Sequence, residues 1–264
     1  MSSLKKRFGQ HFLHDDGVLG AIAQACAAAQ GAETFEIGPG GGALTAHLLH
    51  YFDHLHVVEI DRDLIADLRR RFSAERVQVH EADALRFSFC ASQGASVRVV
   101  GNLPYNISSP LIFHLLQQPC IQGMVFLLQK EVVDRLAASP GGGDYGRLSV
   151  MVQMQCEVTS LFCVPPDAFI PPPKVESRLV YLKPVAPRVP AADRPLFAEI
   201  VSRAFSQRRK MLRQNLKAYL ASTDWVSLGI DPTRRAETLS VEEFAALAAY
   251  VRVRAPVQEP ESAP

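Results

Sequence analysis

The chain has 264 residues, of which 48% are hydrophobic and 21% charged, enough for one large domain with a hydrophobic core and a small second domain. No apolar run approaches the ~20 residues of a membrane-spanning helix and no signal core follows the basic N-terminus, so we expect a cytoplasmic protein. The formal net charge of +1 is too small to indicate a polyanionic partner, so evidence for such a partner has to come from the distribution of charge along the chain.

Helical and strand patterns alternate through the first half of the chain. Helices are predicted at residues 15–30, 43–50 and 61–72, the last capped by Asp61. Strands are predicted at residues 34–37, 56–60, 77–80 and 97–100. Strands that alternate with helices of this length indicate an α/β fold with a parallel, doubly wound sheet.

The second half begins with a helix at 110–117 and an apolar strand at 124–128. Further strands are expected at 148–158 and 177–182, and their short connections favour an antiparallel hairpin at the sheet edge. A proline-rich linker then precedes helical patterns at 196–220 and 241–251. We therefore expect a catalytic domain at residues 1–184, a small all-helical domain at 185–255 and a disordered tail at 256–264.

The cysteines are dispersed, without a CxxC pair and without histidines at the spacing of a metal site. This pattern predicts reduced, mostly buried thiols and no structural metal. The five residues are Cys26, Cys90, Cys120, Cys156 and Cys163.

A glycine-rich turn, residues 38–42, follows the first predicted strand and opens a helix. This arrangement presents backbone amides and a helix N-terminus to a ligand. Glu59 ends the next strand, where a carboxylate can accept both hydroxyls of an adenosine ribose. Asp83 follows the third strand and can accept a hydrogen bond from an adenine amine, while Glu36 can attract an ammonium group. For each carboxylate, the alternative is a helix cap or a solvated position on the surface. Because Ala43 occupies the last position of the dinucleotide fingerprint, the turn alone leaves nicotinamide cofactors open.

Asn102-Leu103-Pro104-Tyr105 follows the fourth strand, at the edge where ligands bind in such sheets. These residues have a chemical explanation if the reacting atom is the N6 nitrogen of adenine. That nitrogen is a poor nucleophile because its lone pair is delocalised into the ring. Acceptors from the Asn102 side chain and the Leu103 carbonyl would favour a pyramidal N6, Pro104 restricts the backbone, and Tyr105 can stack on the base. An ordinary turn is the alternative for an isolated Asn-x-Pro segment.

Five segments carry a resemblance to a known family: KRFGQHFL (6–13), EIGPG (36–40), VEID (58–61), GNLPYNIS (101–108) and AFSQRRK (204–210). The chain resembles the ribosomal RNA adenine dimethylase family, above all its bacterial small-subunit branch, from about residue 5 to 246. The resemblance implies a Rossmann-like class I methyltransferase with S-adenosyl-L-methionine as cofactor. It also implies dimethylation of two adjacent adenosines in a hairpin near the 3′ end of 16S rRNA, in the small ribosomal subunit, and a role in ribosome biogenesis.

The resemblance further assigns residues to roles. The cofactor site would be lined by His11, Leu13, Gly38, Glu59, Asp83 and Asn102. Position 11 is often Asn in this family, so a contact through its backbone would survive the His. Phe169, in AFIPPPKV (168–175), resembles the aromatic residue that packs on the target base, a contact worth roughly 1–3 kcal/mol.

A cluster of positive charge without acidic residues is predicted to bind RNA phosphates. On a continuous helix three of its members would share one face at i, i+4 and i+8, namely Arg209, Arg213 and Lys217. The full predicted set is Arg208, Arg209, Lys210, Arg213 and Lys217. The partner would be 16S rRNA bound by a monomer, without DNA or membrane.

Three other functions remain open at this point. The first is methylation of an adenosine N6 in large-subunit rRNA, which uses the same fold and core motifs. The second is methylation of adenine in DNA, against which the chain lacks a sizeable domain for reading duplex sequence. The third is a largely non-catalytic small-subunit assembly factor, against which the intact 102–105 segment argues.

Overall fold

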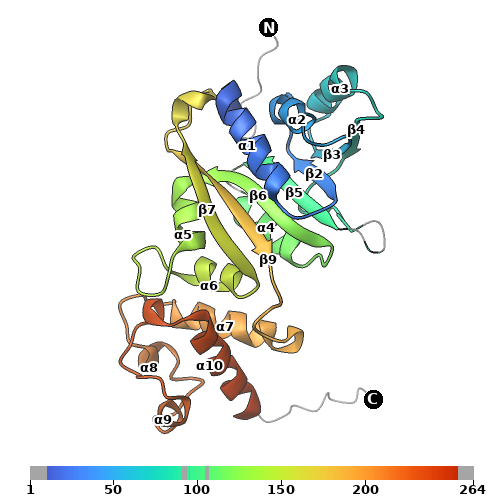
Figure 1. Ribbon diagram of the computed structural model, residues 1–264. Coiled ribbons are helices and arrows are strands. Elements are labelled where there is room, and N and C mark those ends of the chain that lie inside the picture. Colours follow the sequence, from blue (N-terminus) through green and yellow to red (C-terminus); the bar gives the residue numbers. More distant parts are fainter. Residues whose placement is uncertain (1–10, 91–93, 95, 105–106, 255–264) are drawn as a thin grey trace. The chain divides into compact units, whose positions relative to one another are not determined.

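The computed structural model describes residues 11–90, 94, 96–104 and 107–254, which form two compact units (Figure 1). The first unit comprises Met1–Asp134 and Glu157–Val185, and the second comprises Arg135–Cys156 and Ala186–Pro264. The later boundary lies one residue from the expected division at 184/185. Residues 135–156, which were expected in the catalytic domain, group with the helical unit instead, because Tyr145, Val150 and Met154 are buried in its core.

A seven-stranded sheet with the order β4-β3-β2-β5-β6-β9-β7 organises the first unit. Its members are β2 (Glu33–Ile37), β3 (Leu55–Glu59), β4 (Val77–Glu81), β5 (Val97–Asn102), β6 (Ile121–Gln129), β7 (Cys156–Val164) and β9 (Ser177–Pro184). Strands β2 to β6 pair in parallel, whereas β9 pairs antiparallel to β6. The parallel α/β sheet and its antiparallel edge are therefore confirmed.

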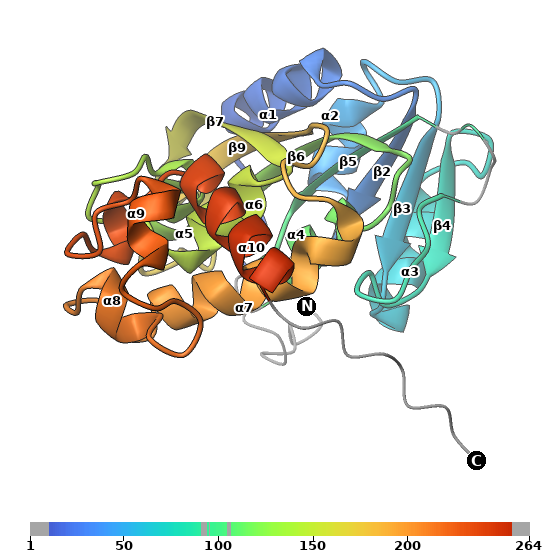
Figure 2. The same ribbon diagram turned by 90° about the horizontal axis from the view of Figure 1, so that it is seen from below.

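Helices cover both faces of this sheet (Figure 2). They are α1 (Asp16–Ala28), α2 (Ala43–Leu48), α3 (Arg62–Arg71), α4 (Ser108–Leu116) and α5 (Lys130–Ala137), which reaches into the second unit. The predicted cap of α3 is confirmed, since the Asp61 side chain accepts a hydrogen bond from the Asp63 amide at 2.9 Å. Buried residues of α1, including Ile22 and Cys26, share a core with Val100 of β5.

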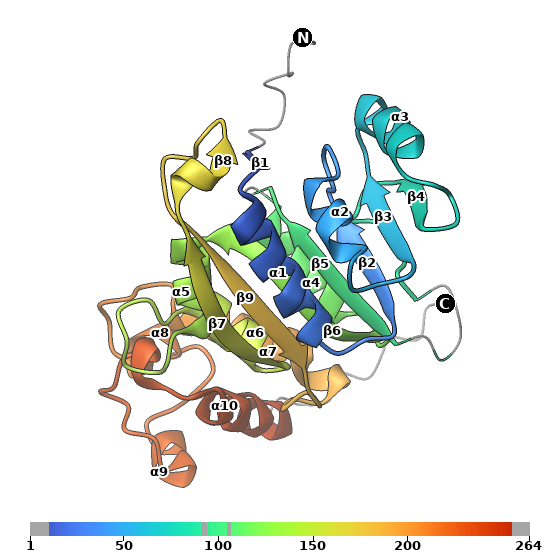
Figure 3. The same cartoon turned by 45° about the horizontal axis from the view of Figure 1, so that its top comes forward.

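A small second sheet joins the start of the chain to a distant segment (Figure 3). Strand β1 (Phe12–Leu13) pairs antiparallel with β8 (Phe169–Ile170), which follows the 3₁₀ helix η1 (Pro166–Ala168). These two-residue strands were not predicted, because each is too short to carry a pattern and is held mainly by its partner. The pairing fixes Phe12 and Leu13 beside the segment that follows η1.

Every regular element in the described part of the second unit, apart from the first residue of β7, is helical. Its helices are α6 (Arg147–Gln153), η2 (Ala191–Asp193), α7 (Arg194–Ala204), α8 (Leu212–Asn215), α9 (Asp224–Leu228), η3 (Ala236–Thr238) and α10 (Val241–Arg254). No helix among the described residues of either unit has the length and apolar character needed to cross a membrane.

Two predicted elements are wrong in this part of the chain. The strand expected at 148–158 is α6 followed by β7, because a short apolar run fits a buried helix as well as a strand. The single helix expected at 196–220 ends at Ala204, passes through a turn at 205–209, and resumes only as the short α8. The expected tail, residues 256–264, lies outside the described residues.

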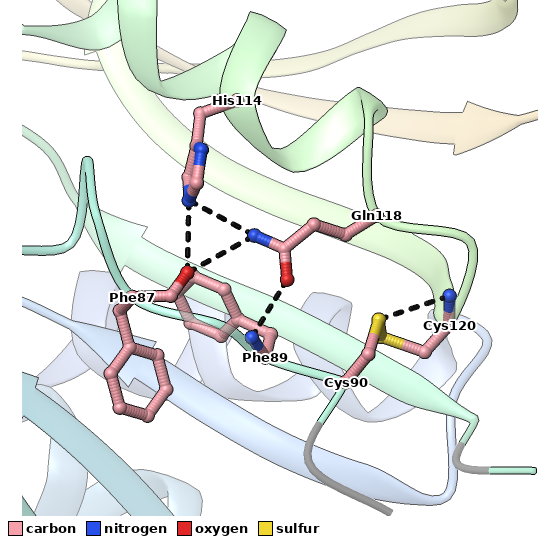
Figure 4. Close-up of a disulfide and its surroundings, with 6 residues drawn as sticks. All are labelled: Phe87, Phe89, Cys90, His114, Gln118 and Cys120. Atoms are coloured by element: carbon pink, nitrogen blue, oxygen red, sulfur yellow. Dashed lines mark hydrogen bonds between the residues drawn. A yellow bond between two sulfur atoms is a disulfide. The ribbon is translucent and has the colours of Figure 1, made fainter. Parts of the chain in front are cut away.

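The expectation that all cysteines are reduced is also wrong, since Cys90 and Cys120 form a disulfide (Figure 4). Parallel strands β5 and β6 begin at the same edge of the sheet, where Val97 pairs with Ile121. This places Cys120, directly before β6, 5.5 Å in Cα–Cα distance from Cys90. Next to the bond, Gln118 accepts from the Phe89 amide at 2.7 Å and ties this segment to the end of α4. Cys26 and Cys156 are buried thiols, and Cys163 is an exposed one.

Candidate cofactor and reaction site

A cavity of about 700 Å³ lies where the parallel strands of the first unit end. Because β2 to β5 run in the same direction, their carboxyl ends meet at one edge of the sheet. All six residues expected to contact the cofactor line the cavity, and so do Leu103 and Pro104 of the reaction segment. These six are His11, Leu13, Gly38, Glu59, Asp83 and Asn102. Tyr105 lies outside the described residues.

The glycine turn provides open space beside the backbone. Gly38 and Gly40 adopt left-handed conformations, with φ of 63° and 57°, which are strained for other residues. A Cβ atom on Gly38 would meet no heavy atom within 4 Å, so the cavity extends up to its backbone. Gly101 serves packing instead, because a Cβ there would lie 2.5 Å from the Ile37 carbonyl oxygen.

One carboxylate oxygen of Glu59 lacks a hydrogen-bond partner among the described residues. Its Oε1 accepts hydrogen bonds from the backbone amides of Ile60 and Asp61, at 2.9 and 3.0 Å. Its Oε2 is buried and has no hydrogen-bond partner among the described residues. A buried acceptor without a donor is costly, so a ligand hydroxyl that donates to Oε2 would be stabilised. An adenosine ribose offers such hydroxyls, and the site therefore fits the expected cofactor.

Asp83 caps a turn and also lines the cavity. Its Oδ1 accepts a hydrogen bond from the Leu85 amide at 2.9 Å, which caps the following turn. The side chain also lines the cavity, so the second oxygen is available to a ligand. The backbone contact orients the carboxylate, so that its second oxygen could accept a hydrogen bond from an exocyclic amine.

Glu36 is buried at the base of the cavity, 2% exposed. The Thr45 hydroxyl donates to its Oε2 at 2.6 Å. Burial raises the pKa of Glu36 to about 7, an effect that the Thr45 hydrogen bond opposes and the nearby Glu59 charge reinforces. A cationic group brought into the cavity would favour the ionised form. Sequence reasoning missed Thr45, whose only signal is a hydroxyl in the first turn of the helix after the glycine turn.

Asn102 is oriented by the N-terminal segment. Its Nδ2 donates to the backbone carbonyl of His11 at 3.1 Å, which leaves the side-chain oxygen as an acceptor. The contact uses the backbone of residue 11, while the His11 ring donates through Nδ1 to the Pro171 carbonyl at 2.7 Å. Replacement of Asn by His at this position is thus compatible with the site.

Phe169 does not lie where a stacking role requires. Its ring is 2% exposed and packs in the core with Leu13 and Leu179, so a base cannot stack on it in this conformation. The adjacent Ile170 lines the cavity and is 55% exposed. Ile60, 59% exposed, is a second apolar lining residue that the sequence analysis missed; its signal is a large apolar residue directly after the acidic strand end.

The predicted RNA-binding residues belong to the second unit and are all exposed. They do not share one helical face, because Arg208 and Arg209 lie in the turn after α7, Arg213 lies in α8, and Lys217 follows it. Arg208 is held by Glu237, with Nε donating to Oε2 at 3.0 Å. The basic residues are therefore distributed over a turn, a short helix and the residues that follow each, and do not form a regular stripe.

Comparisons with known proteins show which family the chain is similar to. The family model "Ribosomal RNA adenine dimethylase" matches residues 1–252. "Ribosomal RNA small subunit methyltransferase A" of Thiobacillus denitrificans is 53% identical over 256 residues, covering 96% of this chain and 100% of the relative. The protein of the same name from Pseudomonas aeruginosa is 53% identical over 249 residues, covering 92% and 93%.

Solved structures with a similar fold include methyltransferases that act on RNA or adenosine. A dimethyladenosine transferase from Plasmodium falciparum is 27% identical with a TM-score of 0.75, covering 90% of this chain and 96% of that one. The 23S rRNA methyltransferase ErmE has a TM-score of 0.72 at 24% identity, covering 91% and 99%, and supports the fold alone. With a family match over nearly its full length, relatives at 53% identity and a methyltransferase fold, the chain belongs to the ribosomal RNA adenine dimethylase family.

Proposed function

We propose that this chain transfers methyl groups from S-adenosyl-L-methionine to adenosine N6 atoms in small-subunit ribosomal RNA. The relatives at 53% identity are named for the small subunit, which supports this substrate. The observation that carries the chemistry is the orientation of Asn102. Its amide nitrogen donates to the His11 carbonyl, so its side-chain oxygen is left as a hydrogen-bond acceptor beside the cavity.

The cofactor would be held by residues at the ends of the parallel strands. Glu59 Oε2 would accept a hydrogen bond from a ribose hydroxyl, and Asp83 would accept one from the adenine amine. Glu36 would attract the ammonium group of the methionine moiety. Gly38 allows close approach to the backbone, and His11 and Leu13 border the same space. When bound, S-adenosylmethionine supplies an electrophilic methyl group on a sulfonium.

The chain's own contribution to the reaction is positioning. The Asn102 side-chain oxygen and the Leu103 carbonyl would accept hydrogen bonds from the two N6 protons, which favours a pyramidal nitrogen with an available lone pair. Pro104 restricts the backbone that presents these acceptors. No strong base is required, since the N6 product ammonium is acidic and loses its proton readily. Orientation and exclusion of water then provide the acceleration.

The finer substrate follows from the resemblance of the motifs. Two adjacent adenosines in a hairpin near the 3′ end of 16S rRNA would each receive two methyl groups, as a step of ribosome biogenesis in the cytoplasm. An unstacked loop base is easily brought into a pocket. The exposed basic residues of the helical unit would bind RNA phosphates, and a monomer suffices for these roles.

The test uses labelled S-adenosylmethionine with unmodified small subunits, unmodified large subunits and duplex DNA in parallel reactions. Labelled RNA is digested and its nucleosides are separated, with Asn102→Ala as the control protein. We expect N6,N6-dimethyladenosine from small subunits alone, and its loss in the control.

Other outcomes contradict specific parts of the proposal. Label in the large subunit or in DNA would refute the substrate while leaving the cofactor assignment intact. Cofactor binding without transfer to any substrate would refute catalysis and support an assembly factor.

A further inference from the structure

The second unit contains a hollow of its own, about 440 Å³ in volume. One wall is Arg147, the first residue of α6, and the rest is one face of α7 with the turn that follows it. Its lining residues are Arg147, Ala198, Glu199, Ser202, Arg203 and Ser206. None of them lines the cofactor cavity, and none is among the five RNA-binding residues predicted from the sequence, although Arg203 begins the basic stretch that holds those five.

The hollow follows from the two-sided character of α7. The polar lining residues recur at i, i+3, i+4 and i+7, which places them along one side of a helix and the turn that follows it. They are Glu199, Ser202, Arg203 and Ser206. The other side of α7 is buried in the core of the unit through Phe197, Ile200, Val201 and Ala204. Packing of the apolar side therefore holds the polar side toward solvent.

Charge in the hollow is positive. Arg147 and Arg203 contribute two guanidinium groups, whereas Glu199 contributes one carboxylate, and Tyr219 donates its hydroxyl to Glu199 Oε1 at 2.5 Å. Five other arginines of this unit form ion pairs with carboxylates: Arg188, Arg208, Arg234, Arg252 and Arg254. Arg147 forms no ion pair with any residue that the structure describes.

We propose that this hollow binds a backbone phosphate of the RNA substrate. The guanidinium groups of Arg147 and Arg203 and the hydroxyl of Ser202 would donate to its oxygens, a geometry for which arginine is well suited. Ser206 instead donates to the Arg203 carbonyl at 2.7 Å and closes the end of α7. The inference rests on the proposed function, since it names a contact for the same RNA.

The position of the hollow in the chain supports RNA over a free anion. Arg203 and Ser206 come shortly before Arg208 and Arg209, which lie in the turn after α7, and before Lys210, which follows that turn. Because these residues are close in the chain, an RNA strand with one phosphate in the hollow would have its neighbouring phosphates near the turn. Such contacts orient RNA without reading its sequence.

Binding of a fluorescent hairpin RNA is measured by anisotropy across a series of salt concentrations. Each phosphate contact contributes roughly 0.7–0.9 to the slope of log K against log salt, so its loss weakens binding about 5- to 8-fold near 0.1 M salt. We expect this loss and a slope reduced by about one for Arg147→Gln. Arg69→Gln, an equal loss of charge on the exposed side of α3 in the first unit, is the matched control and is expected to change neither quantity by as much.

A second variant has the opposite expected sign. Glu199→Gln removes the carboxylate from the hollow while its side-chain oxygen can still accept from Tyr219, so RNA binding is expected to tighten. A purely structural role for this cluster would not strengthen binding. Thermal melting of each variant checks that the fold is retained.

Unchanged affinity and slope for Arg147→Gln relative to Arg69→Gln would overturn the proposal, as would weaker binding by Glu199→Gln. Failure of the proposed function is distinguished by methyl transfer from the wild-type chain to small subunits. Transfer with an unaltered Arg147→Gln slope refutes the hollow alone, whereas absence of transfer refutes the function whatever the slope.

Discussion

Glu59→Gln provides a direct test of the cofactor site. Glutamine keeps a side-chain oxygen that can accept from the Ile60 and Asp61 amides, as Oε1 does now. It replaces the unpartnered, buried Oε2 by a nitrogen that cannot accept a ribose hydroxyl. We therefore expect cofactor binding to weaken while the fold remains stable.

The magnitude follows from the type of bond lost. A hydrogen bond to a charged acceptor contributes about 1.5–3 kcal/mol. This corresponds to a dissociation constant about 10- to 150-fold higher. Stability should be equal or higher without ligand, because the substitution removes a buried charge whose second oxygen has no donor. Glu59→Ala should in addition lose about 2 kcal/mol or more of stability, since it leaves two amides without their acceptor.

Calorimetric titration with S-adenosylhomocysteine measures the affinity, and thermal unfolding without ligand measures stability. Glu33→Gln is the matched control, because it makes the same substitution at the opposite end of β2 from the cavity. Cofactor affinity of Glu59→Gln within about threefold of the wild type would refute the assignment of Oε2 to the ribose.

Three further predictions concern pH and the disulfide. Because the pKa of Glu36 is raised to about 7, its carboxylate ionises through neutral pH, and cofactor affinity should rise by up to ~10-fold per pH unit toward pH 7 and then level off; titrations of Glu36→Gln should be flat, and an unchanged slope would contradict the ammonium contact. Burial lowers the pKa of His56 from 6.5 to about 4 and also lowers that of His80, 3.1 Å away between ring nitrogens, so the unfolded chain binds more protons in this window. Stability is then full above pH 6.5 and falls as pH drops toward 4, with a shallower fall in His56→Phe by chemical denaturation; equal pH dependence would exclude the pair as its source. The bond between Cys90 and Cys120 closes a 30-residue separation, so reductant should cost about 3–4 kcal/mol of unfolding free energy in urea titrations. A variant with both Cys90→Ala and Cys120→Ala should be as stable as the reduced protein and insensitive to reductant. If reductant destabilised this variant, the bond between Cys90 and Cys120 would not be the source of the effect.

Local patterns were sufficient for the parallel strands of the main sheet and for the residues that line the cavity at their carboxyl ends. Each parallel strand is a short apolar run with its own boundary signals, such as the glycine turn after β2 or the Asp61 cap after β3. Parallel strands necessarily end at one edge, so Glu59, Asp83 and Asn102 could be brought together from sequence order alone.

Contacts between distant segments could not be read in the same way. Arg98 occupies a predicted strand, yet only the fold shows it buried, with Nε donating to the Ala29 carbonyl at 2.9 Å and Nη1 to the Thr34 hydroxyl at 2.9 Å. The orientation of Asn102 by His11 likewise depends on the pairing of β1 with β8, whose strands are too short to carry a pattern.

The chain's sequence by itself determined the α/β class, the edge of the sheet where the cavity lies and the presence of a C-terminal helical unit, because repeated local patterns encode them. Tertiary structure alone decided that Cys90 meets Cys120, that Phe169 is buried in the core, and that the helix expected across 196–220 is interrupted. These outcomes depend on which surfaces meet across long separations in the chain. Burial and strand order select among locally acceptable conformations, and no single segment contains that information.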